Sequence, residues 1–169
     1  MKKIHEYEVR GQDTQGAGWF HAPRGNRLHN GVDLVCEARE SIHCFVPGVV
    51  TKIGYPYSPD VHPTKGHLRY IEITADGNKF RYFYVKPKVV LGQIIGLNQN
   101  IGISQDLTKI YPGITQHFHF EVRNTKDRVV PPSLMFPGLD DWDPNETDGD
   151  ATISTESGIP ARRATSTTF

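Results

Sequence analysis

Apolar and polar residues alternate along several short stretches of the chain, and this alternation predicts β-strands. The clearest example is a pair of runs at 68–73 and 80–85, which flank the sequence Ala75-Asp76-Gly77-Asn78. Asp-Gly between two alternating runs is typical of a tight hairpin, because both residues tolerate positive φ. We therefore predict a β-hairpin across these residues.

Shorter apolar runs bounded by glycine or proline predict further strands, at 31–36, 42–46, 49–53, 92–97 and 117–123. The segment 55–66 contains three prolines and predicts a loop, and 101–113 predicts a loop or an irregular turn. No segment keeps a helical period over several turns. The pattern predicts an all-β fold, with antiparallel sheets in a sandwich or half-barrel.

Composition divides the chain into three parts. Residues 1–26 are polar, are punctuated by glycine and proline, and predict an irregular N-terminal arm. Residues 27–137 carry the predicted strands and form the β domain. Residues 138–169 are rich in Asp, Glu, Thr, Ser and Gly and bury too little apolar surface to fold alone. We predict that this tail is extended and lies along other subunits of a larger assembly, or along another copy.

The net charge and the length of the apolar runs limit the kinds of binding partner that we expect. Lys+Arg and Asp+Glu number 19 each, so the bulk charge indicates no nucleic-acid partner. No apolar run is long enough for insertion across a membrane, and no signal-like stretch follows the N-terminal lysines. We expect cytoplasmic synthesis, followed by retention or by exit without a classical signal. Cys36 and Cys44 are too few for a disulfide framework and are either buried thiols or one pair.

Two stretches offer the donors of a metal site. His29 and Asp33 are four residues apart with Gly31 between them, and His117 and His119 alternate on a predicted strand. Glu121 shares their face, where it either orients an imidazole or is exposed to solvent. Each motif alone is weak, but together they predict a zinc site. A two-histidine-one-carboxylate iron oxygenase is a further alternative, although its histidine and carboxylate are usually two residues apart.

These residues resemble the lysostaphin-like, LytM-type zinc metallopeptidases, which cut peptidoglycan cross-bridges. The resemblance covers about residues 19–133 and rests on Arg27-x-His29-x-Gly31-Val32-Asp33 and His117-x-His119. Val46-Pro47-Gly48-Val49-Val50 and Leu91-Gly92-Gln93-Ile94-Ile95-Gly96 follow the family order as well. The resemblance implies that His29, Asp33 and His119 bind zinc. It also implies that His117 is a general base or a transition-state stabiliser.

The sequence departs from this family at one position. Active members carry another histidine in a Tyr-x-His-Leu segment, and here Tyr84-Val85-Lys86-Pro87 matches it, so Lys86 stands in place of the histidine. A lysine is a base near neutral pH only when it is strongly desolvated, but it could stabilise an oxyanion. His62 or His67 could also supply the missing imidazole. The leukocyte cell-derived chemotaxin branch of the family shares the departure, and its members keep zinc without peptidase activity.

The resemblance implies a zinc-binding domain that acts on bacterial cell-wall peptides, with catalysis weakened or lost at Lys86. The alternative is a non-enzymatic, zinc-stabilised structural or recognition module. The polar tail and the lack of a signal stretch suit a component of a phage tail or a similar cell-wall-penetrating assembly. The protein would then be incorporated into a virion or injection machine.

Overall fold

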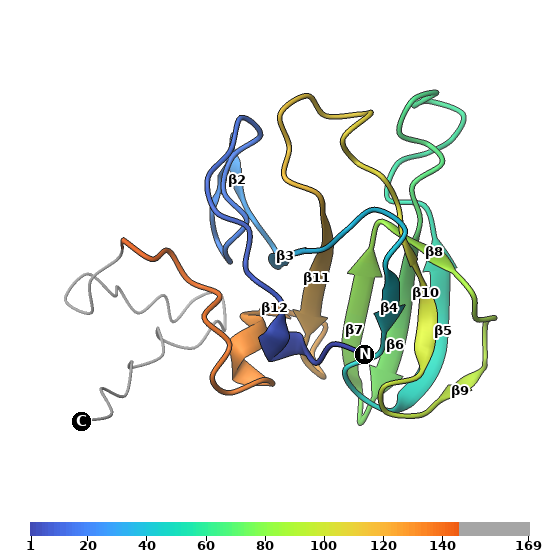
Figure 1. Ribbon diagram of the computed structural model, residues 1–169. Helices are drawn as coiled ribbons and strands as arrows, with labels where there is room; N and C mark the ends of the chain where they lie inside the picture. Colours follow the sequence, from blue (N-terminus) through green and yellow to red (C-terminus); the bar gives the residue numbers. More distant parts are fainter. Residues whose placement is uncertain (146–169) are drawn as a thin grey trace, which may run out of the picture.

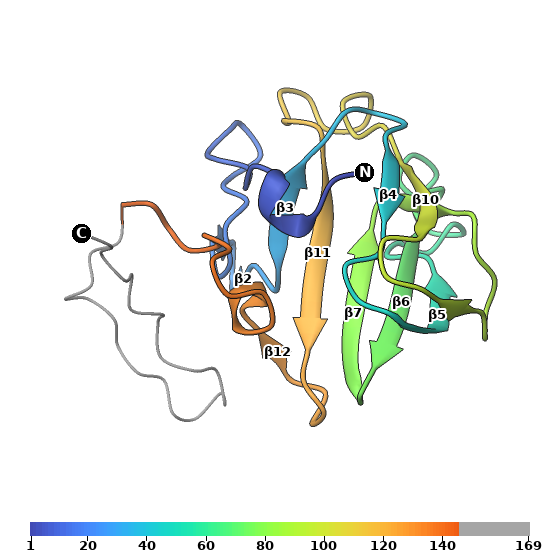
Figure 2. The ribbon, with the colours of Figure 1, turned by 60° about the horizontal axis from the view of Figure 1, so that its bottom comes forward.

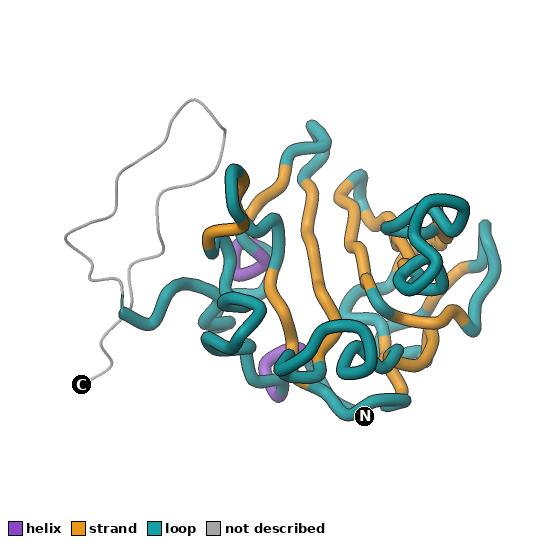
Figure 3. Tube along the Cα trace, turned by 90° about the horizontal axis from the view of Figure 1, so that it is seen from above, coloured by secondary structure: helices purple, strands orange, loops and turns teal. Residues whose placement is uncertain are grey.

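The computed structural model describes residues 1–145, which fold into antiparallel β-sheets that do not close into a barrel. The strands are β1 (Pro23–Arg24), β2 (Arg27–Leu28), β3 (Val32–Val35), β4 (Ser41–His43), β5 (Gly48–Gly54), β6 (Tyr70–Ala75), β7 (Asn78–Phe83), β8 (Val85–Pro87), β9 (Ile94–Ile95), β10 (Asn100–Ser104), β11 (His117–Arg123) and β12 (Val129–Val130). Two short 3-10 turns, η1 (Ile4–Glu6) and η2 (Pro132–Leu134), are the helical segments of the described residues (Figure 3). The all-β prediction is confirmed.

The largest sheet has seven strands. Its main path runs β12-β11-β7-β6-β5-β9, and β3 also pairs with β11 (Figure 1). The predicted hairpin forms its centre, because β6 and β7 pair from Tyr70↔Phe83 to Ala75↔Asn78. Asp76 and Gly77 have φ of 50° and 78°, as a two-residue turn of this kind requires.

A second sheet of three strands, in the order β4-β10-β8, lies beside the large one (Figure 2). One core joins them: Ile42 and Ile101 from the small sheet cluster with Ile73, Phe118 and Phe120 from the large sheet. These five side chains are fully buried. Removing so much apolar surface from water is the main favourable term that holds the two sheets together.

The prediction of a loop at 101–113 was wrong in its first part. Asn100–Ser104 form β10, which is hydrogen-bonded to β4 on one edge and to β8 on the other. Gly102 weakens the strand pattern in the sequence, but the backbone of Lys86 lies where a Cβ at this position would be. Strand β8 can approach β10 this closely only because residue 102 is a glycine. The same glycine interrupts the apolar pattern by which the strand would have been predicted.

Segments on both sides of the predicted β domain pack on it. Ile4 and Tyr7 from the N-terminal arm belong to the same core cluster as the sheets, and so does Leu139. Residues 23–28, at the end of the predicted arm and the start of the predicted β domain, form the β1–β2 hairpin. Most of the predicted tail, 146–169, lies outside the described residues, so its predicted contact with other subunits stays a prediction. Within residues 1–145 no helical segment has the length and apolar character needed to cross a bilayer.

Candidate metal centre

Strand β11 sorts its side chains by face. Phe118, Phe120 and Val122 point into the core and are fully buried, whereas His117, His119 and Glu121 line a cavity on the other face. This follows from the two-residue period of a strand. The predicted division of these side chains between the two faces of the strand is confirmed.

Strand β3 brings the carboxylate to these histidines. It pairs antiparallel with β11, and Asp33 lies directly across from His119. Gly31 permits this approach, because a Cβ there would overlap the carbonyl oxygen of Phe120 and lie 2.8 Å from Cε1 of His119. His29, just before the strand, is held by backbone hydrogen bonds between its N–H and Ala22 O and between its O and the His21 N–H.

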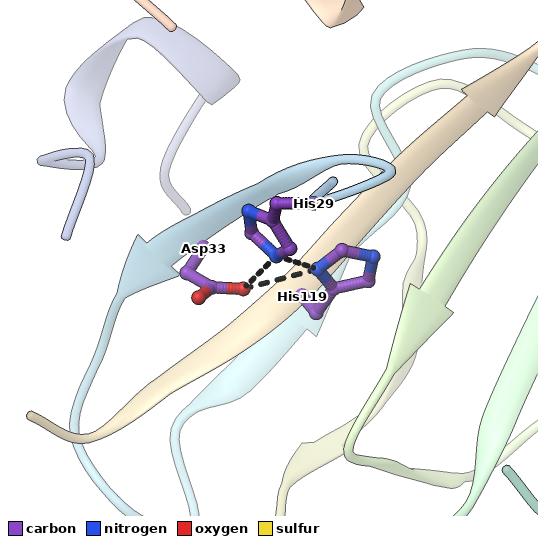
Figure 4. Close-up of side chains that lie close together, drawn as sticks. All are labelled: His29, Asp33 and His119. Carbon is purple, nitrogen blue, oxygen red and sulfur yellow. Dashed lines mark hydrogen bonds and ion pairs between the residues drawn. The ribbon is translucent and has the colours of Figure 1, made fainter. Parts of the chain in front are cut away.

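Three donor atoms converge at this point (Figure 4). Nε2 of His29 lies 2.9 Å from Nδ1 of His119 and 3.2 Å from Oδ1 of Asp33, and Nδ1 of His119 lies 3.0 Å from the same oxygen. Ligands of a tetrahedral zinc ion at its usual bond lengths are about 3.3 Å apart. Two imidazoles and one carboxylate at this spacing therefore fit a zinc ion, with a small outward movement of the donors.

The outer nitrogen of each imidazole faces an oxygen atom of the protein. Nδ1 of His29 lies 2.9 Å from the carbonyl oxygen of Trp19, so this nitrogen donates its proton and Nε2 keeps its lone pair. Nε2 of His119 lies 3.7 Å from Oε2 of Glu121, which leaves Nδ1 for the metal. Carboxylates and carbonyls behind ligating histidines fix the tautomer and the ring orientation. Glu121 is 4% exposed, so it orients an imidazole rather than facing solvent.

The titratable side chains of the cluster shift one another's pKa. Burial alone would lower the pKa of His119, but hydrogen bonds to Asp33 and Glu121 outweigh it and raise the pKa to about 9. Burial would raise the pKa of Asp33, but the rings of His117 and His29 and the hydrogen bond from His119 hold it well below its usual range. Burial lowers the pKa of His29 and His117. Near neutral pH Asp33 is therefore an anion and His29 and His117 are neutral, whereas His119 is protonated until a metal ion displaces the proton from its Nδ1.

Two arginines that the sequence did not single out also reach the site. Arg10, in the N-terminal arm, is 2% exposed, and its Nη2 lies 2.9 Å from Oδ2 of Asp33. Its Nη1 donates to the carbonyl oxygen of Gly16 at 2.7 Å and lies 2.7 Å from Oδ2 of Asp13. Arg24, on β1, approaches the same Asp33 oxygen to 3.5 Å. No motif connects these positions in sequence, since only the fold brings the arm over β3.

His117 lies beside the three donors without joining them. Its Nδ1 donates to the carbonyl oxygen of Thr115 at 2.7 Å, and its Nε2 lies 3.6 Å from Oδ2 of Asp33. The edge of the His117 ring meets the ring of Tyr84 with centroids 5.9 Å apart. Burial raises the pKa of Tyr84 well above its ordinary value, with further contributions from Tyr57 and Asp33. The phenol therefore remains protonated.

The structure does not bring Lys86 to this centre, although the sequence pattern placed it among the catalytic residues. Lys86 is exposed and lines a separate hollow with Arg39, His67 and Lys109. The cause lies at Tyr84, whose φ of 65° interrupts the strand direction between β7 and β8. Strand β8 then pairs with β10, opposite Ile103, instead of continuing along the large sheet. Neither His62 nor His67 is among the residues that line the metal cavity within the described chain.

The centre opens into a cavity of about 370 Å³. Its walls come from the arm, the β1–β2 hairpin, the loop after β5 and the loop before β11, which lie at the same end of the sheet (Figure 1). The described residues that line it are Arg10, Gln15, Arg24, Arg27, His29, Asn30, Asp33, Pro56, Tyr57, Phe83, Tyr84, Leu107, Tyr111, Ile114, His117, His119 and Glu121.

Cys36 and Cys44 take no part, since both are buried free thiols in the core.

Known proteins resemble this chain in sequence and in fold. Leukocyte cell-derived chemotaxin-2 of Bos taurus is 30% identical over 123 residues, which cover 73% of this chain and 78% of that protein. The Mus musculus protein of the same name is 31% identical over 120 residues, which cover 71% and 76% of the two chains. No protein-family model matches the sequence.

Among solved structures, the antimicrobial peptidase lysostaphin from Staphylococcus simulans superposes with a TM-score of 0.55 at 18% identity. The superposition covers 93% of this chain and 65% of that one, so this chain spans just under two thirds of that structure. At this identity the likeness is one of fold.

Proposed function

Because this chain belongs to the lysostaphin-like, LytM-type family of zinc metallopeptidases, we propose that it is a zinc-dependent peptidase-like domain that acts on bacterial cell-wall peptides. The observation that carries the proposal is the convergence of His29, Asp33 and His119 at the base of an open cavity, with His117 beside them. Three protein ligands leave a fourth position open, as in catalytic rather than structural zinc sites. The family is one of metallopeptidases, so the iron oxygenase alternative is not carried further.

The residues around the centre suit peptide hydrolysis. Zinc bound at the three donors would polarise a peptide carbonyl and lower the pKa of a water molecule. His117 donates its Nδ1 proton to Thr115, so Nε2 is free to accept a proton from the attacking water. Burial lowers the pKa of His117, so the ring is neutral near pH 7 and its Nε2 has a lone pair available to accept a proton. The same nitrogen can then return the proton to the departing amine.

Tyr84 is suited to the part that the missing second imidazole plays in active relatives. Tyr84 lines the cavity and its ring contacts that of His117. Because its pKa is raised, the O–H remains a donor and can stabilise negative charge on the carbonyl oxygen during attack. A phenol cannot exchange protons at neutral pH as an imidazole does, so we propose that catalysis is weaker than in members with both histidines.

A second candidate function is a non-enzymatic module that uses zinc for stability or recognition. One observation favours it. The described lining of the cavity contains three histidines, and two of them are proposed zinc ligands, so one imidazole remains for catalysis; Lys86 lies in another hollow. In this case zinc would stabilise the fold, and the cavity would bind a peptide without cutting it.

Hydrolysis of purified, dye-labelled cell wall by the zinc-loaded protein distinguishes the two functions. The peptidase proposal predicts soluble dye and new free amines from the wild type. It also predicts that His117→Ala loses about 10²–10⁴-fold in rate while it retains one zinc per chain. Wild-type protein that carries zinc but releases nothing contradicts the peptidase and supports the module.

We further propose that the chain works within a cell-wall-penetrating assembly, such as a phage tail, with residues 138–169 in contact with other subunits. The support is compositional, since this segment is rich in Asp, Glu, Thr, Ser and Gly. Mass spectrometry of purified particles tests it. The full chain should be found in the particles and a chain ending at residue 145 should not, whereas equal incorporation of both would contradict a role for the tail.

A further inference from the structure

The carboxylates of the cavity are neutralised from within the protein. Two line its described part, Asp33 and Glu121, and they are 3% and 4% exposed. Arg10 pairs with Asp33, as described above. Oε1 of Glu121 accepts a hydrogen bond from Nε of Arg123 at 2.7 Å and lies 3.5 Å from Nη1 of Arg81. Neither carboxylate is therefore free to pair with a cationic group of a peptide.

The cavity has more cationic side chains than are needed to neutralise these two carboxylates. Arg24 is partly used, because its guanidinium donates to the carbonyl oxygens of Ala17 and Pro23 and approaches Asp33. Arg27 lies on the other strand of the same hairpin, lines the cavity and is exposed. Within residues 1–145 its side chain makes no hydrogen bond or ion pair. The cavity thus presents one uncommitted guanidinium among its lining residues.

The remaining walls carry no charge that would satisfy Arg27. The loops after β5 and before β11 contribute Tyr57 and Tyr111, whose hydroxyl groups lie 3.3 Å apart. Nζ of Lys65 lies over both rings, 4.9 Å and 5.6 Å from their centroids. These walls are therefore aromatic, with a further cation behind them. A bound zinc ion would add to the positive potential that an approaching ligand meets.

We propose that the peptide accepted by this cavity carries a carboxylate, and that Arg27 is the residue that binds it. A guanidinium pairs with a carboxylate through two parallel hydrogen bonds, which gives both affinity and orientation. The substrate class is then an acidic oligopeptide, whose carboxylate occupies the side of the β1–β2 hairpin while its backbone lies over the metal donors. This inference rests on the proposed function, since it assumes that the cavity binds a peptide.

The test compares two fluorescent cell-wall stem peptides that differ only in whether the glutamyl carboxyl is free or amidated. Fluorescence anisotropy measures their binding to the zinc-loaded full chain. The wild type should bind the free acid about tenfold more tightly than the amide, in line with one hydrogen-bonded charge pair. Arg27→Gln should abolish this difference. Arg128→Gln, a matched change at an exposed arginine outside the cavity, should preserve it.

Equal binding of the two peptides by the wild type, a preserved preference in Arg27→Gln, or no binding of either peptide overturns the inference. Cleavage is followed in the same samples, so that the two proposals fail separately. A preference for the acid without cleavage contradicts the peptidase and supports Arg27 as the carboxylate-binding residue. Cleavage of both peptides at equal rates and affinities supports the peptidase and contradicts the role of Arg27.

Discussion

Arg10 and Asp33 form a buried ion pair behind the metal centre. Nη2 and Nε of Arg10 lie 2.9 and 3.2 Å from Oδ2 of Asp33, and Oδ1 of the same carboxylate faces His29 and His119. The arginine thus holds one oxygen of Asp33 and directs the other toward the metal donors. Arg10, a residue of the N-terminal arm, therefore fixes the orientation of the Asp33 side chain on β3.

Replacing Arg10 should destabilise the fold. Arg10→Met leaves the Asp33 carboxylate buried without its arginine, and breaking such a pair costs about 3–5 kcal/mol in the free energy of unfolding. Urea denaturation of the metal-free protein at pH 7 measures this loss. Arg128→Met, at an exposed arginine, is the control and should change stability by less than about 0.5 kcal/mol. A loss of similar size in both variants would argue against the ion pair as the cause.

Gly31 should tolerate no side chain. In Gly31→Ala the new Cβ meets the carbonyl of Phe120 and the ring of His119, so either β3 moves away from β11 or the ring turns. We expect weaker zinc binding together with a lower melting temperature, measured by calorimetry with and without zinc. Gly11→Ala is the matched control, because no atom lies within 4 Å of a Cβ there. Unchanged zinc affinity in Gly31→Ala would show that this close approach is not needed.

The parts of the site that lie in one strand could be predicted from the sequence. The two-residue period of β11 alone assigns His117, His119 and Glu121 to one face, and the structure agrees. The bounds of β11 also follow from the uninterrupted alternation between 117 and 123. The local sequence pattern was therefore sufficient to predict those features of the site that depend on one strand alone.

The parts that depend on chain direction or on distant segments could not be predicted. Lys86 follows Tyr84 by two residues and would share its face in a continuous strand, but the positive φ of Tyr84 ends that continuity. Positive φ at a tyrosine is unfavourable and has no sequence signature, so the change of direction before Lys86 could not be predicted from the alternation of residues. Arg10 was missed because its partner is 23 positions away along an arm without a regular pattern.

Because Tyr84 lines the metal cavity and Lys86 does not, substitutions at the two positions should have different effects on kcat. If the protein cleaves cell-wall peptides, Tyr84→Phe should lower kcat by about 10²–10³-fold, because a donor to the developing oxyanion is lost. Lys86→Ala should leave kcat unchanged, since this side chain lies in another hollow. Steady-state kinetics on a synthetic cross-link peptide checks both. A large effect of Lys86→Ala would restore Lys86 to the mechanism.

The stability of the fold should depend on pH through Asp141. This side chain is fully buried; its Oδ2 accepts a hydrogen bond from the Ser133 N–H at 2.7 Å, and its Oδ1 has no partner within the described residues. Burial raises the pKa of Asp141 to about 6. Because the folded pKa is above the unfolded one, folding favours the protonated acid. The stability it contributes is complete below about pH 4 and is lost as the pH rises through 6.

The variant Asp141→Asn isolates this contribution. At pH 8 it should be more stable than the wild type by up to about 3 kcal/mol, the equivalent of the pKa difference, and the gain should vanish near pH 4. Free energies of unfolding across this pH range provide the measurement. Asp140→Asn, at the exposed neighbour, should show no such trend. A constant difference between Asp141→Asn and the wild type at all pH values would contradict titration of Asp141.

His29, Asp33 and His119 should together bind one zinc ion. Elemental analysis of the purified protein after equilibration with micromolar zinc tests it most directly, with circular dichroism as the check on folding. We predict one zinc per chain in the wild type and in the control His67→Ala, whose exposed side chain lies outside the cavity, and none in a folded His119→Ala. A wild type without zinc, or a His119→Ala variant that retains a full equivalent, would contradict the account.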